Sequence, residues 1–142
     1  MKFKILSLFF ITTLAYVLCD NQIQLDVYKF NKIKYLDYTE FIVKNNLRNT
    51  FYPTKNKYEF SYKNNFFYFS PFSEFCKVND NIYNMIYPAL YKDSKLYLPV
   101  ASFYKIIQKE GLPFKIVNFS NGHLTSSTQE FNIKDLNVIN KS

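Results

Sequence analysis

The stretch from Lys95 to Gly111, KLYLPVASFYKIIQKEG, constrains the fold of this chain more than any other. It starts as a short alternating segment that ends at Pro99. Beyond the proline, apolar residues recur at positions i, i+3, i+4 and i+7: Val100, Phe103, Tyr104 and Ile107. Proline suits the first turn of a helix, where its missing N–H is not needed, and glycine suits the left-handed residue that ends one. The pattern predicts a strand that leads directly into a helix, with four structural anchors: Tyr97, Pro99, Phe103 and Ile107.

An earlier stretch, KYLDYTEFI, has a similar pattern. Three identities in nine positions align at a spacing of 62 residues: Tyr35 with Tyr97, Leu36 with Leu98, and Phe41 with Phe103. Asp37 takes the place of Pro99, and Glu40 three residues later gives the spacing of a capping box, in which each side chain accepts a backbone N–H from the other residue. We therefore expect two tandem copies of one strand–helix unit.

The rest of the chain is dominated by β-strand patterns. Alternation is clearest in KYEFSY, and Pro71 makes FFYFSPFSEF an interrupted or edge strand. Further strands are expected at residues 22–30, 82–87, 90–91, 113–119 and 123–128, with turns near 54–56, 63–65, 78–82, 92–94 and 120–122. The predicted fold class is α+β: two tandem small units of antiparallel strands, each followed by a packed helix.

The first residues have the layout of a secretory signal peptide. Lys2 and Lys4 precede an apolar run from Ile5 to Leu18, and the chain turns polar at Asp20. The run is short for a stable transmembrane span. We therefore expect residues 1–19 to be a signal peptide and the protein to be periplasmic or secreted after cleavage. Lipid attachment at Cys19 and cleavage just after it are both open.

Charge and cysteine content restrict the partners. The formal net charge is +7, but the lysines are spread along the chain, and a nucleic-acid reader would show a concentrated basic patch. Nucleic acid is therefore not an expected partner, and the membrane is expected only through the signal peptide. A mild attraction to anionic cell-wall polymers remains open. Cys76, inside SPFSEFCKV, is expected to be a buried small hydrophobe and not a nucleophile.

The run YFSPFSEFCKVNDNIYNMIYPALYKDSKLYLPVASFYKII resembles the copper amine oxidase-like N-terminal domain, as found at the front of bacterial exported N-acetylmuramoyl-L-alanine amidases. The resemblance covers Ile33 to Val117, and LYLPV with Phe103 is its most specific part. It implies that residues 20–117 form such a domain, made of two strand–helix repeats. Residues 118–142 would then be a linker or the start of a following β domain, so the chain would be a fragment of a longer protein.

The chemistry that these family names imply needs residues that are scarce in this sequence. Zinc amidase and copper sites draw on several imidazoles, and the chain has one histidine, His123, expected at a turn or the surface. A ligand role for His123 shared with another domain is the alternative. Two glycines leave no phosphate-binding loop. We therefore expect no catalytic residue, cofactor or metal. The candidate glycan-facing aromatics are Tyr62, Tyr68 and Tyr83.

These observations lead to two functional hypotheses. The first is a noncatalytic, exported accessory module of a peptidoglycan hydrolase that resembles N-acetylmuramoyl-L-alanine amidase. It would position the enzyme or contact the wall, and its partners would be peptidoglycan and a downstream catalytic domain of the same protein. The second is a free-standing secreted interaction or adhesion protein.

Overall fold

The computed structural model describes residues 21–128. The first half of this part contains β1 (Asn21–Phe30), β2 (Ile33–Asp37), α2 (Tyr38–Lys44), β3 (Arg48–Tyr52), a 3-10 turn η1 (Pro53–Lys55), β4 (Lys57–Tyr62) and β5 (Asn65–Phe69). The second half contains β6 (Phe75–Val78), β7 (Asn81–Asn84), β8 (Leu90–Lys92), β9 (Lys95–Pro99), α3 (Val100–Lys109), β10 (Phe114–Ser120) and β11 (His123–Thr128).

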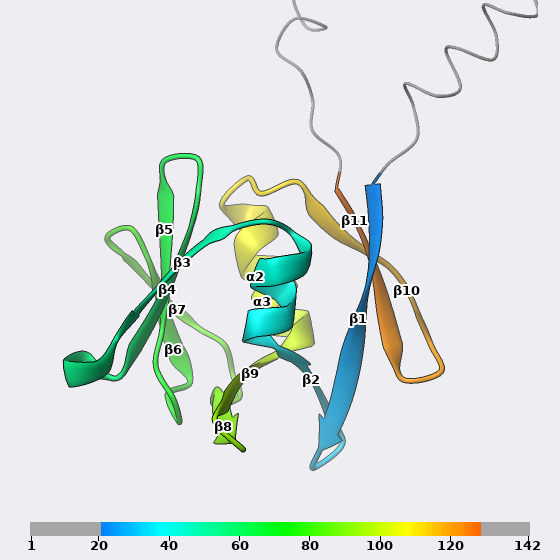
Figure 1. Cartoon of the computed structure of the whole chain (residues 1–142), viewed down its shortest axis with the longest axis horizontal. Coiled ribbons are helices and arrows are strands. Elements are labelled where there is room, and N and C mark those ends of the chain that lie inside the picture. The colour runs from blue at the N-terminus through cyan, green and yellow to red at the C-terminus, as the bar shows by residue number, and fades with distance from the viewer. Residues whose placement is uncertain (1–20, 129–142) are drawn as a thin grey trace, which may run out of the picture.

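The strands form two antiparallel sheets with the helices between them (Figure 1). One sheet has six strands in the order β10-β11-β1-β2-β9-β8, and the other has five in the order β3-β4-β5-β6-β7. The predicted α+β class is confirmed, although sheet predominates over helix. Each helix can bury side chains against two sheets because it lies between them, and this arrangement explains why so short a chain carries so many buried aromatic residues.

Strands β2 and β9 are neighbours inside the six-stranded sheet, and each leads directly into a helix. In their antiparallel register Leu36 lies opposite Leu98, Tyr35 opposite Pro99, and Asp37 opposite Tyr97. Both leucines are fully buried. The two helices therefore start from neighbouring strands that run in opposite directions.

Both helices end in the same hydrogen-bonded motif. After α2, Asn46 has φ 53° and the next residue, Leu47, donates its N–H to Ile42 O at 3.0 Å. After α3, Gly111 has φ 83° and Leu112 donates its N–H to Ile107 O at 2.9 Å. This is the Schellman pattern, in which a left-handed residue lets the chain turn back and satisfy the last carbonyls. The predicted left-handed role of Gly111 is confirmed.

The N-termini of the two helices differ, and here the sequence prediction was partly wrong. Asp37 caps α2 because its Oδ1 accepts the N–H groups of Thr39 at 2.8 Å and Glu40 at 3.3 Å. Glu40 does not complete a capping box: its carboxylate accepts the N–H of Asp26 on β1 at 3.2 Å. Pro99 is the N-cap of α3 and not its first helical residue, and it offers no side-chain acceptor.

The core is one continuous, mostly aromatic cluster. Phe41 of α2 and Phe103 of α3 pack edge to face, with ring centroids 4.9 Å apart and planes at 87°. Phe103 also contacts Phe60 and Phe69 of the five-stranded sheet, at centroid distances of 6.3 and 5.8 Å. Of the predicted anchors, Phe103 and Ile107 are fully buried and Pro99 is buried. Tyr97 is half-buried and packs against Tyr28.

Two predicted features differ in extent from the structure, and a third agrees with it. The strand expected over residues 82–87 ends at Asn84. The run FFYFSPFSEF is interrupted around Pro71 between β5 and β6, which is the first of the two predicted alternatives, and β5 lies at the centre of its sheet. The domain boundary predicted at Val117 falls inside β10. Residues 118–128 belong to the same sheet, because β11 pairs with β1 from Asn21 opposite Thr128 to Asp26 opposite His123.

The predicted signal peptide, Cys19 and residues 129–142 lie outside the described residues. Within residues 21–128, neither helix is long and apolar enough to cross a membrane.

Candidate functional site: a lysine-ringed groove beside α3

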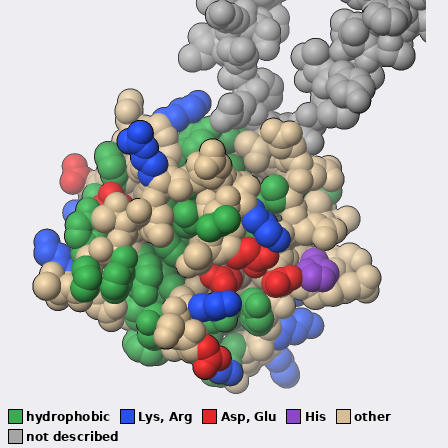
Figure 2. Space-filling model, in the orientation of Figure 1, with side chains coloured by type: hydrophobic (Ala, Val, Ile, Leu, Met, Phe, Trp, Pro, Cys, Tyr) green, Lys and Arg blue, Asp and Glu red, His purple; other side chains and the backbone are tan. Residues whose placement is uncertain are grey.

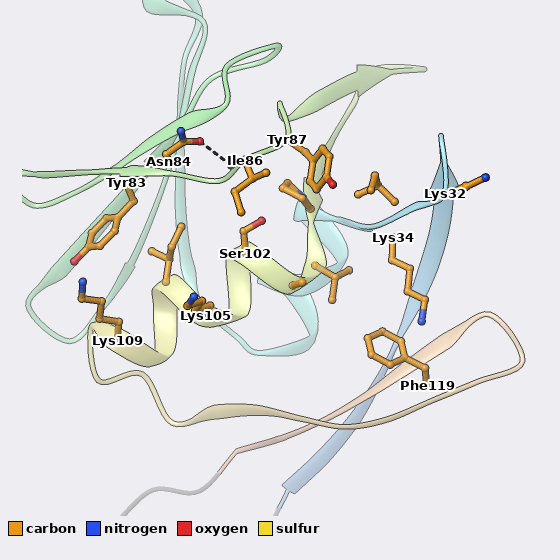
Figure 3. Close-up of a pocket in the computed structure, with 15 residues that line it drawn as sticks. Lys32, Lys34, Tyr83, Asn84, Ile86, Tyr87, Ser102, Lys105, Lys109 and Phe119 are labelled. Carbon is orange, nitrogen blue, oxygen red and sulfur yellow. Dashed lines mark hydrogen bonds between the residues drawn. The ribbon is translucent and has the colours of Figure 1, made fainter.

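A groove of about 670 Å³ runs over the outer side of α3 (Figure 3). We call it the α3 groove. Its apolar lining consists of Ile33, Tyr83, Ile86, Tyr87, Pro99, Val100, Ala101, Ile106 and Phe119. Its polar lining consists of Lys32, Lys34, Lys105, Lys109, Asn84 and Ser102. The volume falls in the range of about 300–1,000 Å³ that is usual for small-ligand sites.

The floor of the groove is the first two turns of α3. The apolar periodicity of this helix turns Phe103 and Ile107 toward the core, which leaves Ala101 and Lys105 exposed on the opposite side. Ala101 contributes only a methyl group, so the helix surface is low at this point. The groove therefore follows from the placement of a small residue between larger ones.

One wall is the irregular segment between β7 and β8, which three hydrogen bonds hold in place. Ile86 donates its N–H to Asn84 Oδ1 at 2.7 Å, and Met85 donates its N–H to Glu74 O at 2.7 Å. Ser102 of α3 donates its hydroxyl to Met85 O at 2.6 Å. The wall is thus fixed both to the five-stranded sheet and to the groove floor.

Ile86 has an unusual conformation in this wall. Its φ is 72°, in the left-handed region that a β-branched residue rarely adopts, and its side chain is 68% exposed. Such a backbone costs on the order of 1–3 kcal/mol and persists only where the surroundings enforce it. An isoleucine side chain is therefore held out at the rim of the groove at a cost in stability.

The opposite wall comes from the hairpins of the six-stranded sheet. The β1–β2 turn, with Asn31 and Lys32 at φ 48° and 67°, carries Lys32, and Lys34 follows on β2. The Nζ atom of Lys34 lies 3.9 Å from the ring centroid of Phe119 on β10. Figure 3 shows this pair at one end of the groove and Lys105 with Lys109 at the other.

The rim of the groove is positively charged. Within residues 21–128, none of Lys32, Lys34, Lys105 and Lys109 forms an ion pair with a carboxylate, and no acidic residue lines the groove. Glu110, next to Lys109, accepts a hydrogen bond from the hydroxyl of Tyr83, and this bond raises the pKa of Tyr83. The groove thus offers apolar surface between two pairs of lysines.

Carboxylates gather instead on the face that Figure 2 shows, beside the histidine. His123 Nδ1 lies 2.8 Å from Asp26 Oδ1, and Glu40 pairs with Lys44 at 2.8 Å. His123 is half-exposed at the start of β11, which agrees with the expected surface position. No group of three or more metal-ligand side chains occurs among the described residues.

The three candidate glycan-facing aromatics do not form one surface. Tyr83 lines the α3 groove. Tyr62, at the end of β4, packs against Phe114 with ring centroids 5.6 Å apart. Tyr68 lies on the outer face of the five-stranded sheet, opposite Glu59 and Lys77 in the register, with Lys57 Nζ 4.0 Å from its ring centroid.

Cys76 lies in the core at 3% exposure, and burial raises the pKa of its thiol to about 12. This environment agrees with the predicted role as a small hydrophobe and disfavours the thiolate that a nucleophile needs. The α3 groove itself was not predicted from the sequence, because its lining comes from separate segments spread from Lys32 to Phe119. The one local signal is Pro88, which limits the preceding strand and so predicts an irregular segment near Ile86.

Comparison with protein-family models, with curated proteins and with solved structures finds no match for this chain.

Proposed function

We propose that this protein is a binding module that works without chemistry of its own and holds its partner in the α3 groove. The single observation that carries the proposal is the α3 groove itself. It is apolar, and its four rim lysines have no carboxylate partner within residues 21–128. Unpaired charges around an apolar surface favour a complementary partner, because only such a partner compensates for their desolvation.

We further propose that the module is the exported accessory part of a peptidoglycan hydrolase, where it positions the enzyme or contacts the wall. The support is the family resemblance together with a twofold relation between the two halves. Leu36 and Leu98, which a shift of 62 residues superimposes, lie directly opposite each other in the antiparallel pair of β2 and β9. The shared helix-end motif adds to this relation. Two tandem copies of one hairpin–helix unit account for both observations.

The alternative is a free-standing secreted interaction or adhesion protein. Exposed apolar side chains on the outer face of the five-stranded sheet favour it, because Phe66, Phe75 and Ile82 are 42%, 49% and 71% exposed. Side chains of this kind, together on one surface, are typical of protein–protein contacts. The two candidates differ in which surface the partner covers.

A pelleting experiment tests the wall-binding role. The purified full chain is mixed with insoluble peptidoglycan at low salt, next to the variants Ala101→Trp, which fills the groove floor, and Phe66→Ala, which alters the outer face. We expect retention of the native chain, and loss of retention in Ala101→Trp would place the wall contact in the groove. Absence of retention of the native chain would contradict wall contact, and loss of Phe66→Ala alone would move the binding surface to the outer face.

A further inference from the structure

We propose that the ligand of the α3 groove is a single-chain anionic amphiphile: an acyl chain that ends in a carboxylate or a phosphate. The inference rests on the proposed function in one respect, namely that the groove is the binding surface. It goes beyond that function by naming the ligand chemistry.

The polar groups of the lining argue for an acyl chain over a glycan or an extended peptide. Asn84 and Ser102 are the only uncharged polar side chains, apart from the tyrosine hydroxyls, among the lining residues. Asn84 Oδ1 already accepts the Ile86 N–H, and the Ser102 hydroxyl already donates to Met85 O. A sugar or a peptide backbone would bring hydroxyl or amide groups along its whole length, and most of them would be left without partners. A methylene chain needs no partners.

The charge of the rim selects an anionic head group. Lys32 and Lys34 stand at one end of the groove and Lys105 and Lys109 at the other, and no acid lines the space between them (Figure 3). Lys34 and Lys109 rest over Phe119 and Tyr83, at 3.9 and 5.4 Å from the ring centroids. An ammonium held over an aromatic ring stays at the border of the apolar surface, where it can meet a head group.

The strained wall gives independent support. The left-handed backbone of Ile86 holds a 68% exposed aliphatic side chain against the groove, and the three hydrogen bonds of this segment maintain it. Strained residues are enriched at functional sites, although Phe72, at φ 65°, has the same kind of backbone outside the groove. An acyl chain in the groove would cover Ile86 and remove apolar surface from water, which favours binding.

Isothermal titration of the purified full chain with dodecanoate, below the concentration at which it forms micelles, tests the inference. We expect one ligand per chain. Hexanoate should bind at least about 30-fold more weakly, because each methylene that leaves water improves affinity by up to about fourfold. Dodecyl maltoside, with a neutral head, and dodecyltrimethylammonium, with a cationic one, should bind more weakly, by about two- to fivefold for each lysine contact that is lost. Dodecyl phosphate distinguishes a phosphate head from a carboxylate, according to which binds more tightly.

Variants locate the site. Ala101→Trp should weaken dodecanoate binding at least about tenfold, because it removes most of the room on the floor. Thr39→Trp is the matched control, since Thr39 is the exposed residue of α2 that the 62-residue shift places on Ala101. If Ala101→Trp does not fold, Lys34→Gln and Lys105→Gln replace it as test variants. Each is expected to lower the affinity for dodecanoate about two- to fivefold. Lys77→Gln, on the outer face of the five-stranded sheet, should leave the affinity for dodecanoate unchanged.

Equal affinity for the anionic, neutral and cationic detergents, or unchanged binding by the groove variants, would overturn the inference, as would no binding of dodecanoate. Retention on peptidoglycan without dodecanoate binding would overturn the ligand class and leave the proposed function standing. Binding of dodecanoate without retention on peptidoglycan would support the inference and contradict wall contact.

Discussion

Replacement of Phe103 by alanine is the sharpest test of the packing described above. The side chain is fully buried, and its ring contacts Phe41 of α2 at 4.9 Å and Phe69 of the five-stranded sheet at 5.8 Å. Deletion of a buried phenylalanine costs about 3–5 kcal/mol, as lost transfer free energy plus a cavity. Because domains of this size have unfolding free energies of about 5–15 kcal/mol, we expect Phe103→Ala to lose a large part of the total.

Urea unfolding followed by far-ultraviolet circular dichroism measures this loss. With an m-value of about 1–3 kcal/mol per molar urea, a loss of about 4 kcal/mol lowers the midpoint by roughly 1.5–4 M. Phe66→Ala is the control, because Phe66 is 42% exposed on the outer face and should cost less than about 1 kcal/mol. Equal effects of the two variants would refute the placement of α3 between the sheets. So would separate transitions for circular dichroism and tyrosine fluorescence, since one continuous core predicts a single transition.

Three further predictions concern the caps, the buried titratable groups and the strained wall. Asp37→Ala should lower the unfolding free energy by about 1 kcal/mol because two N–H groups of α2 lose their acceptor, whereas Lys95→Gln should cost less than about 0.5 kcal/mol, both measured by urea unfolding. Burial raises the pKa values of Cys76 and Tyr104 to about 12, so both groups favour the folded state while protonated. Stability should therefore be constant below about pH 8.5 and fall as the pH rises toward 12, and a melting temperature unchanged up to pH 11 would contradict this. Ile86→Asn should raise the unfolding free energy by about 1 kcal/mol, because asparagine tolerates the left-handed backbone, and should weaken dodecanoate binding; lower stability would contradict the strain.

The sequence predicted the features that depend on local patterns. Helix α3 was predictable because the spacing from Val100 to Ile107 reports a buried stripe, and the end of this helix was predictable because Gly111 is one of only two glycines. The burial of Cys76 could be predicted from its apolar neighbours. Each of these features is decided within about ten residues.

Features that depend on contacts between distant residues were not predictable. Glu40 has the spacing of a capping box, but its carboxylate bonds to the N–H of Asp26 on a neighbouring strand. The position of residues 123–128 in the six-stranded sheet could not be predicted, because the pairing of β11 with β1 joins residues about a hundred positions apart. The α3 groove requires two hairpins, the segment between β7 and β8, and a helix to meet, and no periodicity within one segment predicts that meeting.

The central claim is that this module binds through the α3 groove, and amide chemical-shift mapping tests it most directly. The ¹⁵N-labelled full chain is titrated with dodecanoate. The account predicts that the largest shifts fall on groove residues such as Ile33, Ile86, Ala101 and Phe119, and that Ala101→Trp abolishes them while Thr39→Trp does not. Shifts that cluster instead around Phe66 and Tyr68, on the outer face of the five-stranded sheet, would contradict it.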